Sequence, residues 1–404
     1  MNRLTSIDLF AGAGGLALGL HRSGFDHLAL VEFNRHACAT LRLNAEAGVV
    51  APPWPVFETD VRDFDYAREV GANEIDLLAA GAPCQPFSLG GRHRGDEDGR
   101  NMFPHVFDAV RTLRPRAILL ENVRGLKRQS FRPYFEYILL QVELPYLPPR
   151  EDEAWWAHKE RLLAERRRWP LLNQDETYDV HERLLNSADF GVPQRRERVI
   201  VVAFRRDLGV AWEYPAGGSS EDRLLYEQFV TGEYWARHDL SPRPVPDKLV
   251  GRIARLAQCP PVGRPWRTLR DALLGLPEPI AGRPANGVTF HVGIPGARIY
   301  KGHTGNQLDT PAKTIKAGDH GNPGGEHILV RDDGSIRYLT VRECARIQAY
   351  PDEYLFAGSR TEAMRQIGNA VPVMLGERVS IGIWRALAKA DLSSLTERAL
   401  LVGD

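Results

Sequence analysis

The sequence predicts an α/β protein built on a parallel β-sheet, together with a second region that is rich in loops. Short apolar runs alternate with amphipathic segments over the first 125 residues. Strands separated by helices are typical of right-handed β-α-β units, in which helices cover both faces of a parallel sheet. From residue 213 to about residue 337 Pro and Gly become frequent and long periodic segments disappear, which marks the second region.

The expected elements follow from the local patterns. Buried strands are predicted at the apolar runs 6–10, 27–31, 76–80, 117–120 and 199–204, and helices at 16–23, 34–44 and 151–169. The last of these helices is rich in charged residues and suits a solvated insertion. Thr340-Val341-Arg342-Glu343 has the form of a capping box, so a helix should begin there, and the chain from about residue 362 onward is predicted to be mostly helical.

Composition excludes several classes of protein. A chain of 404 residues with 43% hydrophobic and 26% charged residues is typical of a globular protein of two domains or one elaborated domain. The four cysteines lie far apart without a C-x-x-C pair, which argues against a zinc site and a disulfide framework. No apolar run is long enough for a membrane span, so we expect a cytoplasmic protein.

A glycine turn follows the first predicted strand. Phe10-Ala11-Gly12-Ala13-Gly14-Gly15 would let a ligand approach the backbone at a helix N-terminus. The spacing is not the G-x-G-x-x-G of nicotinamide-binding proteins, and alone it fits a purely structural turn equally well.

Acidic residues at the next two strand ends favour a ligand site at this turn. Glu32 could accept hydrogen bonds from two ribose hydroxyls, and Asp60 could accept one from an adenine amino group. Phe10 and Phe33 could pack against the adenine ring. Each acid alone is more often a helix cap or a surface charge, but their joint placement is harder to explain in that way.

A cysteine and a glutamate follow two neighbouring strands. The segment Gly81-Ala82-Pro83-Cys84-Gln85-Pro86-Phe87-Ser88 comes after the strand 76–80, and Glu121 comes after the strand 117–120. A lone cysteine is usually a small buried hydrophobe. Here two prolines and the glycine-rich polar stretch 90–101 favour a shaped loop at the carboxyl end of the sheet, where ligands bind. Cys84 and Glu121 are therefore a candidate nucleophile and acid.

Six ordered blocks make the sequence resemble the cytosine-5 DNA methyltransferase family of prokaryotic restriction-modification systems. The blocks are residues 8–15, residues 81–88, Glu121-Asn122-Val123, Gly191-Val192-Pro193-Gln194-Arg195-Arg196-Glu197-Arg198, Arg342-Glu343-Cys344-Ala345-Arg346-Ile347-Gln348 and Gln366-Ile367-Gly368-Asn369-Ala370-Val371. They span nearly the whole chain, and together they are highly specific.

The resemblance implies a fold and a division of the chain. We expect a Rossmann-like S-adenosylmethionine-dependent methyltransferase domain and a second, smaller, loop-rich target-recognition domain. The expected boundaries are 1–206 for the catalytic and cofactor-binding domain, with a helical insertion at about 126–180, and 207–337 for the recognition domain. Residues 338–404 would return to the catalytic domain.

The resemblance also assigns roles. Cys84 would add to carbon 6 of cytosine, Glu121 would protonate N3, and Arg196 and Arg198 would stabilise the thiolate and the developing ring charge. The cofactor would be S-adenosylmethionine as methyl donor. Its expected contacts are Phe10, Gly12, Gly14, Gly15, Glu32, Phe33, Asp60, Pro83, Asn369 and Val371.

Double-stranded DNA is the expected partner, and the thiolate can reach carbon 6 only if the target base leaves the helix. The loop 88–100 is a candidate lid, in which Arg92, Arg94 and Arg100 could reach phosphates. Between Arg243 and Lys316 twelve basic residues stand against four acids, a local balance of +8 in a chain of zero net charge. An unevenly charged, solvated surface would give the same count. The segment 310–318 is a candidate base-contacting loop, and the full set of expected DNA contacts is Gln85, Ser88, Arg92, Arg94, Lys313 and Lys316.

Alternatives stay open at this point. A tRNA cytosine-5 methyltransferase of similar fold is the first, although the Cys-Phe-Thr tripeptide of that branch is absent. A non-catalytic DNA-binding relative and a small-molecule methyltransferase are the others. We expect a monomer that needs no metal and does not bind membranes, with a cognate restriction endonuclease acting on the same site without a stable complex.

Overall fold

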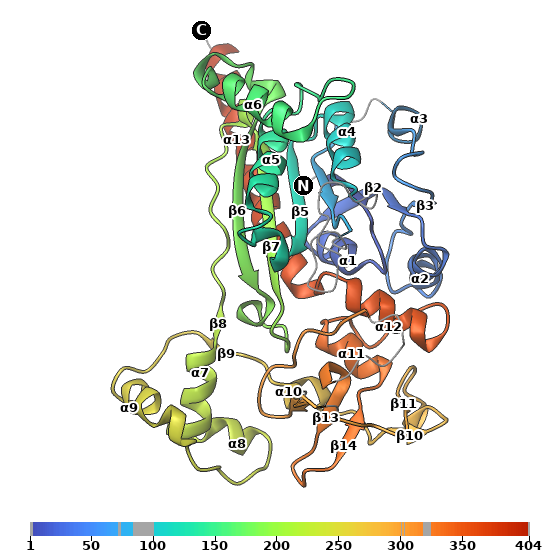
Figure 1. The fold of residues 1–404 in the computed structure, drawn as a ribbon, viewed down its shortest axis with the longest axis vertical. Helices are drawn as coiled ribbons and strands as arrows, with labels where there is room; N and C mark the ends of the chain where they lie inside the picture. Colours follow the sequence, from blue (N-terminus) through green and yellow to red (C-terminus); the bar gives the residue numbers. More distant parts are fainter. Residues whose placement is uncertain are drawn as a thin grey trace.

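The computed structural model describes residues 3–71, 74–83, 101–299, 301–302, 304–317 and 325–402. Figure 1 shows an upper part built around a sheet and a lower part of short helices and strands, with α11 (Val341–Ile347) and α12 (Arg360–Asn369) between them. The chain begins in the upper part, passes through the lower part and returns, because the last helix, α13 (Val373–Val402), lies behind the sheet.

The sheet has seven strands in the order β3-β2-β1-β4-β5-β7-β6. The strands are β1 (Leu4–Leu9), β2 (Phe25–Glu32), β3 (Val56–Glu58), β4 (Leu77–Ala80), β5 (Ala117–Val123), β6 (Tyr178–Asn186) and β7 (Glu197–Arg205). Strands β1 to β5 pair in parallel, whereas β7 pairs antiparallel with both β5 and β6. The predicted α/β class and all five predicted strands are confirmed.

The sequence analysis did not find β6, which begins at Tyr178 within the range expected to be a helical insertion. That range does contain two helices, α5 (Arg132–Glu143) and α6 (Trp155–Arg166), before the strand begins. β6 is an edge strand with two exposed charged residues, Glu182 and Arg183, so it lacks the apolar run that identifies buried parallel strands.

Helices cover both faces of the sheet. On one face α3 (Tyr66–Val70), α4 (Phe103–Leu113) and α5 pack over one apolar cluster, and on the other α1 (Gly15–Arg22) packs with α13 over a second. A further helix, α2 (Arg35–Glu46), follows β2. Within the described ranges no helix combines the length and hydropathy of a membrane-spanning segment.

The lower part has little regular structure. Its elements are β8 (Ser219–Ser220), α7 (Glu221–Tyr226), α8 (Glu233–Arg237), α9 (Val250–Gln258), β9 (Arg264–Pro265), α10 (Leu269–Leu273), β10 (Ile280–Ala281), β11 (Val292–Gly293), β12 (Asn306–Gln307), β13 (Ile328–Val330) and β14 (Ile336–Tyr338). The predicted capping box is confirmed: Thr340 and Glu343 cap α11 reciprocally. A third apolar cluster joins Leu269 and Ile315 to Ile367 and to Ala11 of the glycine turn, so the two parts share a core.

Helices α1 and α13 approach each other closely at Gly19. A Cβ atom at this position would lie 2.6 Å from the backbone nitrogen of Glu377 and 3.0 Å from the carbonyl oxygen of Val373. Both neighbours are backbone atoms of α13, so they cannot move aside without shifting the helix. The contact therefore depends on the absence of a side chain at residue 19.

We expect Gly19→Ala to lower the free energy of unfolding by roughly 1–3 kcal/mol, because the added methyl group overpacks this contact. Chemical denaturation followed by circular dichroism measures the change. Gly251→Ala is the matched control, since Gly251 lies in α9 with nothing within 4 Å of an added Cβ. There the higher helix propensity of Ala should leave stability unchanged or raise it by up to about 1 kcal/mol. Equal effects of the two substitutions would contradict the close contact.

Candidate active site

The glycine turn lies between β1 and α1 and is fastened to the end of β2. Gly12 and Gly14 have φ of +54° and +77°, which favours glycine at both positions. The Gly12 amide donates to Glu32 Oε2 at 2.9 Å, and the Asn34 amide donates to Glu32 Oε1 at 2.7 Å. Burial raises the pKa of the Glu32 carboxyl. Its remaining lone pairs can still accept hydroxyl donors from a ligand.

The C-terminal block of the chain meets the same turn. A Cβ atom at Gly15 would collide with the carbonyl oxygen of Val371 and lie 3.1 Å from the Cβ of Ala370. The Tyr354 hydroxyl donates to the carbonyl of Ala13 at 2.8 Å. The structure therefore brings Val371 to the glycine turn, and Asn369, exposed at the end of α12, lies two residues away along the chain.

The predicted adenine contacts differ in their surroundings. Phe33 is 68% exposed and is available for stacking, whereas Phe10 is half-buried with a φ of +58°, a strained conformation for an aromatic residue. The Asp60 carboxylate accepts two bonds from the Arg62 guanidinium, at 2.9 and 2.6 Å. Hydrogen bonding from Arg62 lowers the pKa of Asp60 to about 2, so this acceptor stays charged.

Asp8 is a further candidate that the sequence analysis missed. Its side chain is 1% exposed, and neither carboxyl oxygen has a hydrogen-bond partner within the described part of the chain. Burial and the nearby charge of Glu32 raise the pKa of Asp8 well above its usual value. A buried carboxyl without partners costs free energy, so a positively charged ligand is the natural complement of this pair of acids. The feature of the sequence that could have identified Asp8 as a site residue is its position as an acidic residue inside an apolar strand.

The predicted acid lies in a buried ion pair. Arg198 Nε is 2.7 Å from Glu121 Oε1, and both side chains are about nine-tenths buried. The two residues come from adjacent strands, because Val123 of β5 is paired with Arg198 of β7. The attraction within a buried ion pair offsets the free-energy cost of desolvation only if the geometry is good. The pair therefore fixes the position of the Glu121 carboxyl.

The end of β4 runs alongside this ion pair. The Asn122 side-chain amide donates to the carbonyl of Ala82 at 3.2 Å, and a Cβ atom at Gly81 would lie 3.7 Å from Glu121 Oε2. Pro83 is the last described residue before residue 101. The predicted nucleophile Cys84 and the predicted DNA contacts Gln85, Ser88, Arg92 and Arg94, as well as Arg100, lie outside the described residues.

Arg196, the other arginine predicted at the site, has different partners from Arg198. Arg196 is 1% exposed and donates to the carbonyls of Ile315 at 2.9 Å, Gly368 at 2.7 Å and Ala370 at 3.0 Å. Arg196 thus joins two backbone segments, one at residue 315 and one at residues 368–370, whereas Arg198 binds the predicted acid. The expected catalytic role of Arg196 stays a prediction.

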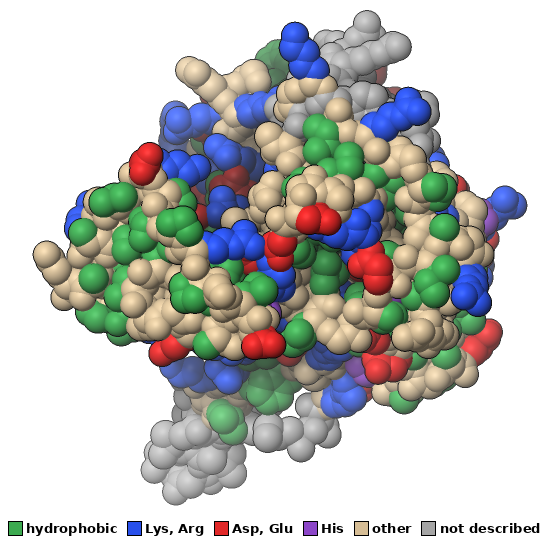
Figure 2. Space-filling model, turned by 90° about the horizontal axis from the view of Figure 1, so that it is seen from below, with side chains coloured by type: hydrophobic (Ala, Val, Ile, Leu, Met, Phe, Trp, Pro, Cys, Tyr) green, Lys and Arg blue, Asp and Glu red, His purple; other side chains and the backbone are tan. Residues whose placement is uncertain are grey.

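Ion pairs reduce the basic excess that the sequence predicts for the lower part. Arg243 and Arg270 both bind Asp309 and Asp332. Asp332 lies outside residues 243–316, the range over which the charges were counted. Arg252 and Lys316 are also paired with acids outside that window. Eight of the twelve basic residues have no ion pair with another described residue: Lys248, Arg255, Arg264, Arg267, Arg283, Arg298, Lys301 and Lys313. Figure 2 shows Lys and Arg side chains gathered along a hollow beside the left-hand lobe, which is formed by α7 to α9.

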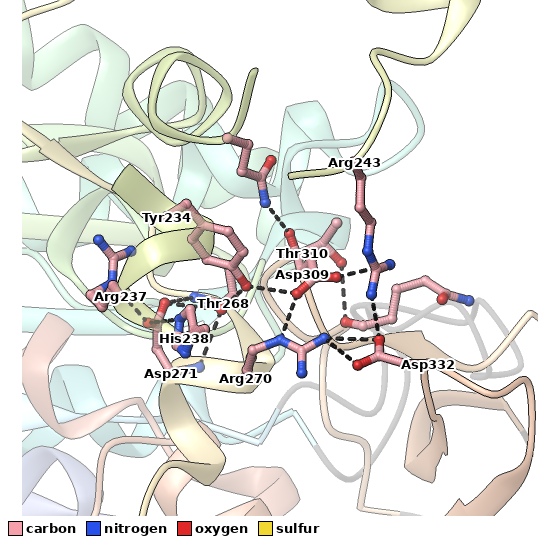
Figure 3. A network of polar contacts seen from close by, with 12 residues as sticks. Tyr234, Arg237, His238, Arg243, Thr268, Arg270, Asp271, Asp309, Thr310 and Asp332 are labelled. Atoms are coloured by element: carbon pink, nitrogen blue, oxygen red, sulfur yellow. Dashed lines mark hydrogen bonds and ion pairs between the residues drawn. The ribbon is translucent and has the colours of Figure 1, made fainter. Parts of the chain in front are cut away.

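A polar network holds the start of the predicted base-contacting segment. Asp309 Oδ1 accepts from the Tyr234 hydroxyl at 2.9 Å and from Arg270 Nε at 2.7 Å, and Arg243 pairs with its other oxygen (Figure 3). Within the segment that follows, Lys313 and Lys316 are exposed, but Ala312 and Ile315 are buried. The segment is therefore an extended, anchored stretch that presents its lysines outward.

The chain is similar to known proteins over most of its length. Residues 4–144, 171–233 and 289–383 match the family model "C-5 cytosine-specific DNA methylase". The type II methyltransferase M.NgoMIV of Neisseria gonorrhoeae is 32% identical over 96% of this chain and all of its own length. M.Eco47II of Escherichia coli is also 32% identical, over 96% of this chain and 81% of its own length.

Solved structures share the fold. A protein described as a DNA modification methyltransferase encoded within an E. coli prophage superposes with a TM-score of 0.58 at 20% identity, over 95% of this chain and 99% of its own. The S. pombe Dnmt2 methyltransferase gives 0.53 at 17% identity, over 96% and 99% of the two chains. Because the family model covers most of the chain and the relatives match it nearly end to end, the chain belongs to the C-5 cytosine-specific DNA methylase family and is a DNA cytosine-5 methyltransferase.

Proposed function

We propose that this enzyme methylates carbon 5 of a flipped-out cytosine in a specific duplex DNA sequence, through a covalent bond between Cys84 and carbon 6. The buried Glu121–Arg198 pair supports this proposal most, because it lies beside the backbone that leads into Cys84. The relatives carry the names of type II methyltransferases. We therefore also propose that the methylation protects DNA from a cognate restriction endonuclease.

The chemistry needs a nucleophile and an acid on one ring. Carbon 5 of cytosine is too weak a nucleophile by itself, and adding the Cys84 thiolate to carbon 6 gives it enamine character. Arg198 binds Glu121 Oε1, so Oε2 is the oxygen that can share a proton with N3 and favour this addition. Carbon 5 then takes the methyl group from the donor. The donor leaves as the thioether S-adenosylhomocysteine. Loss of the carbon 5 proton to solvent, return of the N3 proton to Glu121 and departure of the thiolate then restore the aromatic ring and the free enzyme.

The methyl donor is S-adenosylmethionine, and the residues around the glycine turn fit it. The donor supplies an activated methyl group on a sulfonium, and it also carries an ammonium group and two ribose hydroxyls. Glu32 would bind the hydroxyls, Phe33 would stack on the adenine and Asp60 would accept from its amino group. The buried carboxyl of Asp8, which has no hydrogen-bond partner among the described residues, would offset the positive charge.

The lower part of the molecule would recognise DNA. Eight of its basic side chains have no ion pair with a described residue and suit phosphate contacts. The exposed Lys313 and Lys316 lie on the anchored segment that follows Asp309. We propose residues 207–337 as the recognition domain and the loop 88–100 as the lid over the flipped base. We further propose a monomer that acts in the cytoplasm on chromosomal DNA; the bacterial relatives are named type II methyltransferases, which supports the DNA substrate.

Trapping tests the covalent step. Duplex DNA that contains 5-fluorocytosine should form a denaturant-stable adduct with the wild-type protein and S-adenosylmethionine, because fluorine cannot leave as a proton does. Gel electrophoresis under denaturing conditions detects the adduct. Cys84→Ser should form none while still binding DNA and the donor, and Cys259→Ser, at an exposed cysteine, is the control. An adduct in the Cys84→Ser protein would overturn the assignment.

We expect Glu121→Gln to lower kcat by roughly 10²–10⁴, the range for loss of a positioned acid. Donor affinity should stay within about two-fold, because Glu121 is assigned to the base and not to the donor. Single-turnover transfer of labelled methyl groups measures the rate. Glu182→Gln is the matched control, since Glu182 is an exposed acid on β6 that pairs with Lys127. A wild-type rate for Glu121→Gln would rule out the acid role.

Asp8→Asn should change stability and donor affinity in opposite directions. The raised pKa of Asp8 means that the folded protein binds this proton more tightly than the unfolded chain. Stability should therefore be greatest below pH ~4, the usual Asp value, and fall as pH rises through the window up to the raised pKa. Asp8→Asn removes that fall, so the variant should be more stable than wild type at neutral pH.

The same variant should bind S-adenosylmethionine more weakly, because the carboxylate that offsets its positive charge is gone. Thermal melts across pH and isothermal titration give the two readouts, and Asp63→Asn, at an exposed site, serves as control. Unchanged donor affinity in Asp8→Asn would contradict the proposed contact.

A further inference from the structure

Three buried polar side chains join the base-contacting segment to the catalytic core. We call Gln194, Arg196 and Gln348 the interdomain latch; their exposed fractions are 0%, 1% and 0%. Buried polar groups in native proteins are nearly always hydrogen-bonded, because an unmade bond leaves the desolvation cost unrelieved. The partners of these three side chains therefore show which segments the latch holds together.

On one side the latch holds the segment that presents the lysines. The Ile315 amide donates to Gln194 Oε1 at 3.2 Å, and the Ile315 carbonyl accepts from Arg196 Nη1 at 2.9 Å. Backbone hydrogen bonds add to this contact. The Ala312 amide donates to the Pro193 carbonyl at 2.9 Å, and the Arg195 amide donates to the Ala312 carbonyl at 2.8 Å. Both backbone polar groups of Ile315 are thus bound by side chains of the residue 191–198 block.

On the other side the latch holds the chain around the cofactor block. Arg196 Nη2 donates to the carbonyls of Gly368 and Ala370, the two residues that flank Asn369. Gln348 Nε2 donates to the Ile367 carbonyl at 2.6 Å, and it also reaches the Ala370 carbonyl at 3.3 Å. Ala370 in turn packs against Gly15 of the glycine turn.

The two held segments also touch each other directly. A Cβ atom at Gly368 would collide with the amide nitrogen of Ala317, so the end of the base-contacting segment lies against α12 without room for a side chain. Movement of either segment would separate Arg196 from at least one of its three carbonyls. One residue, Arg196, therefore stands between the segment that faces DNA and the turn that faces the methyl donor.

We propose that Arg196 is a positioning residue that couples the binding of target DNA to the binding of the methyl donor. The inference rests on the proposed function of both sites. The guanidinium is planar and offers its donors in a fixed fork, so all three carbonyls can be bound together only in one arrangement of the two segments. A ligand that stabilises this arrangement at one site favours binding at the other, and such coupling is reciprocal.

Binding of S-adenosylhomocysteine tests the proposal, because this product lacks the methyl group and allows no turnover. Isothermal titration gives its dissociation constant for the protein alone and for the protein saturated with a duplex that carries the recognised sequence. We expect the duplex to tighten binding about 5-fold or more in wild type, within the usual range of coupled sites. Arg196→Lys keeps the charge but loses the fork. In this variant the ratio of the dissociation constant without duplex to that with duplex should fall to within about two-fold of unity.

Arg342→Lys is the matched control. Arg342 is also fully buried and donates to three carbonyls, those of Thr289, Pro351 and Tyr354. Among the described residues it makes no hydrogen bond to the base-contacting segment. It should lose stability as Arg196→Lys does and keep the wild-type ratio. A ratio near unity in wild type, a wild-type ratio in Arg196→Lys, or an equal loss in Arg342→Lys would each overturn the coupling.

A further variant covers the case in which Arg196→Lys does not fold. Gln348→Met removes the bonds to Ile367 and Ala370 and leaves the buried charge in place. A reduced ratio in this variant supports the latch, and a wild-type ratio contradicts it. Failure of the wild-type protein to bind S-adenosylhomocysteine at all would instead reject the proposed cofactor site, and the coupling with it.

Discussion

The close contact between the glycine turn and the returning C-terminal chain determines how the molecule is arranged. Gly15 leaves no space beside Val371 and Ala370, and Gly19 leaves none between α1 and α13. The proposed cofactor site, which combines the glycine turn with the returning chain, can therefore form only after the chain has passed through the lower part and come back. This order explains why residues from both ends of the sequence build one site, and why the lower part is held between them.

The buried charged side chains of the proposed site differ in how their charges are compensated. Glu121 and Arg198 form an ion pair across β5 and β7, and Arg196 donates to backbone carbonyls. Asp8 is different, because its carboxyl has no hydrogen-bond partner among the described residues. An apolar residue would be more stable at that position, so the acid is best explained by a ligand that brings positive charge.

Much of the fold could be predicted from the sequence, because the buried parallel strands are continuous apolar runs and the glycine turn follows the first of them. The capping box at Thr340 is equally local, and it was predicted correctly. Edge strand β6 escaped prediction, since its polar residues carry no strong period. Its two helical neighbours within the same stretch explain why a helical insertion was expected there.

Long-range pairing accounts for what the sequence could not show at the site. The basic excess of the lower part is reduced because Asp332 and Glu326 lie outside the window that was counted. Nothing local to Arg196 indicates that its partners are the carbonyls of residues 315, 368 and 370. The strand ends did place Glu121 near the backbone that leads to Cys84, since neighbouring strands end at one edge of a sheet.

The most direct test of the proposed function is bisulfite sequencing of duplex DNA after incubation with the purified protein and S-adenosylmethionine, with tRNA treated in parallel. We expect protected cytosines at one short recurring sequence in the DNA and none in the tRNA. Protection confined to the tRNA, or no protected cytosine in either nucleic acid, would contradict it.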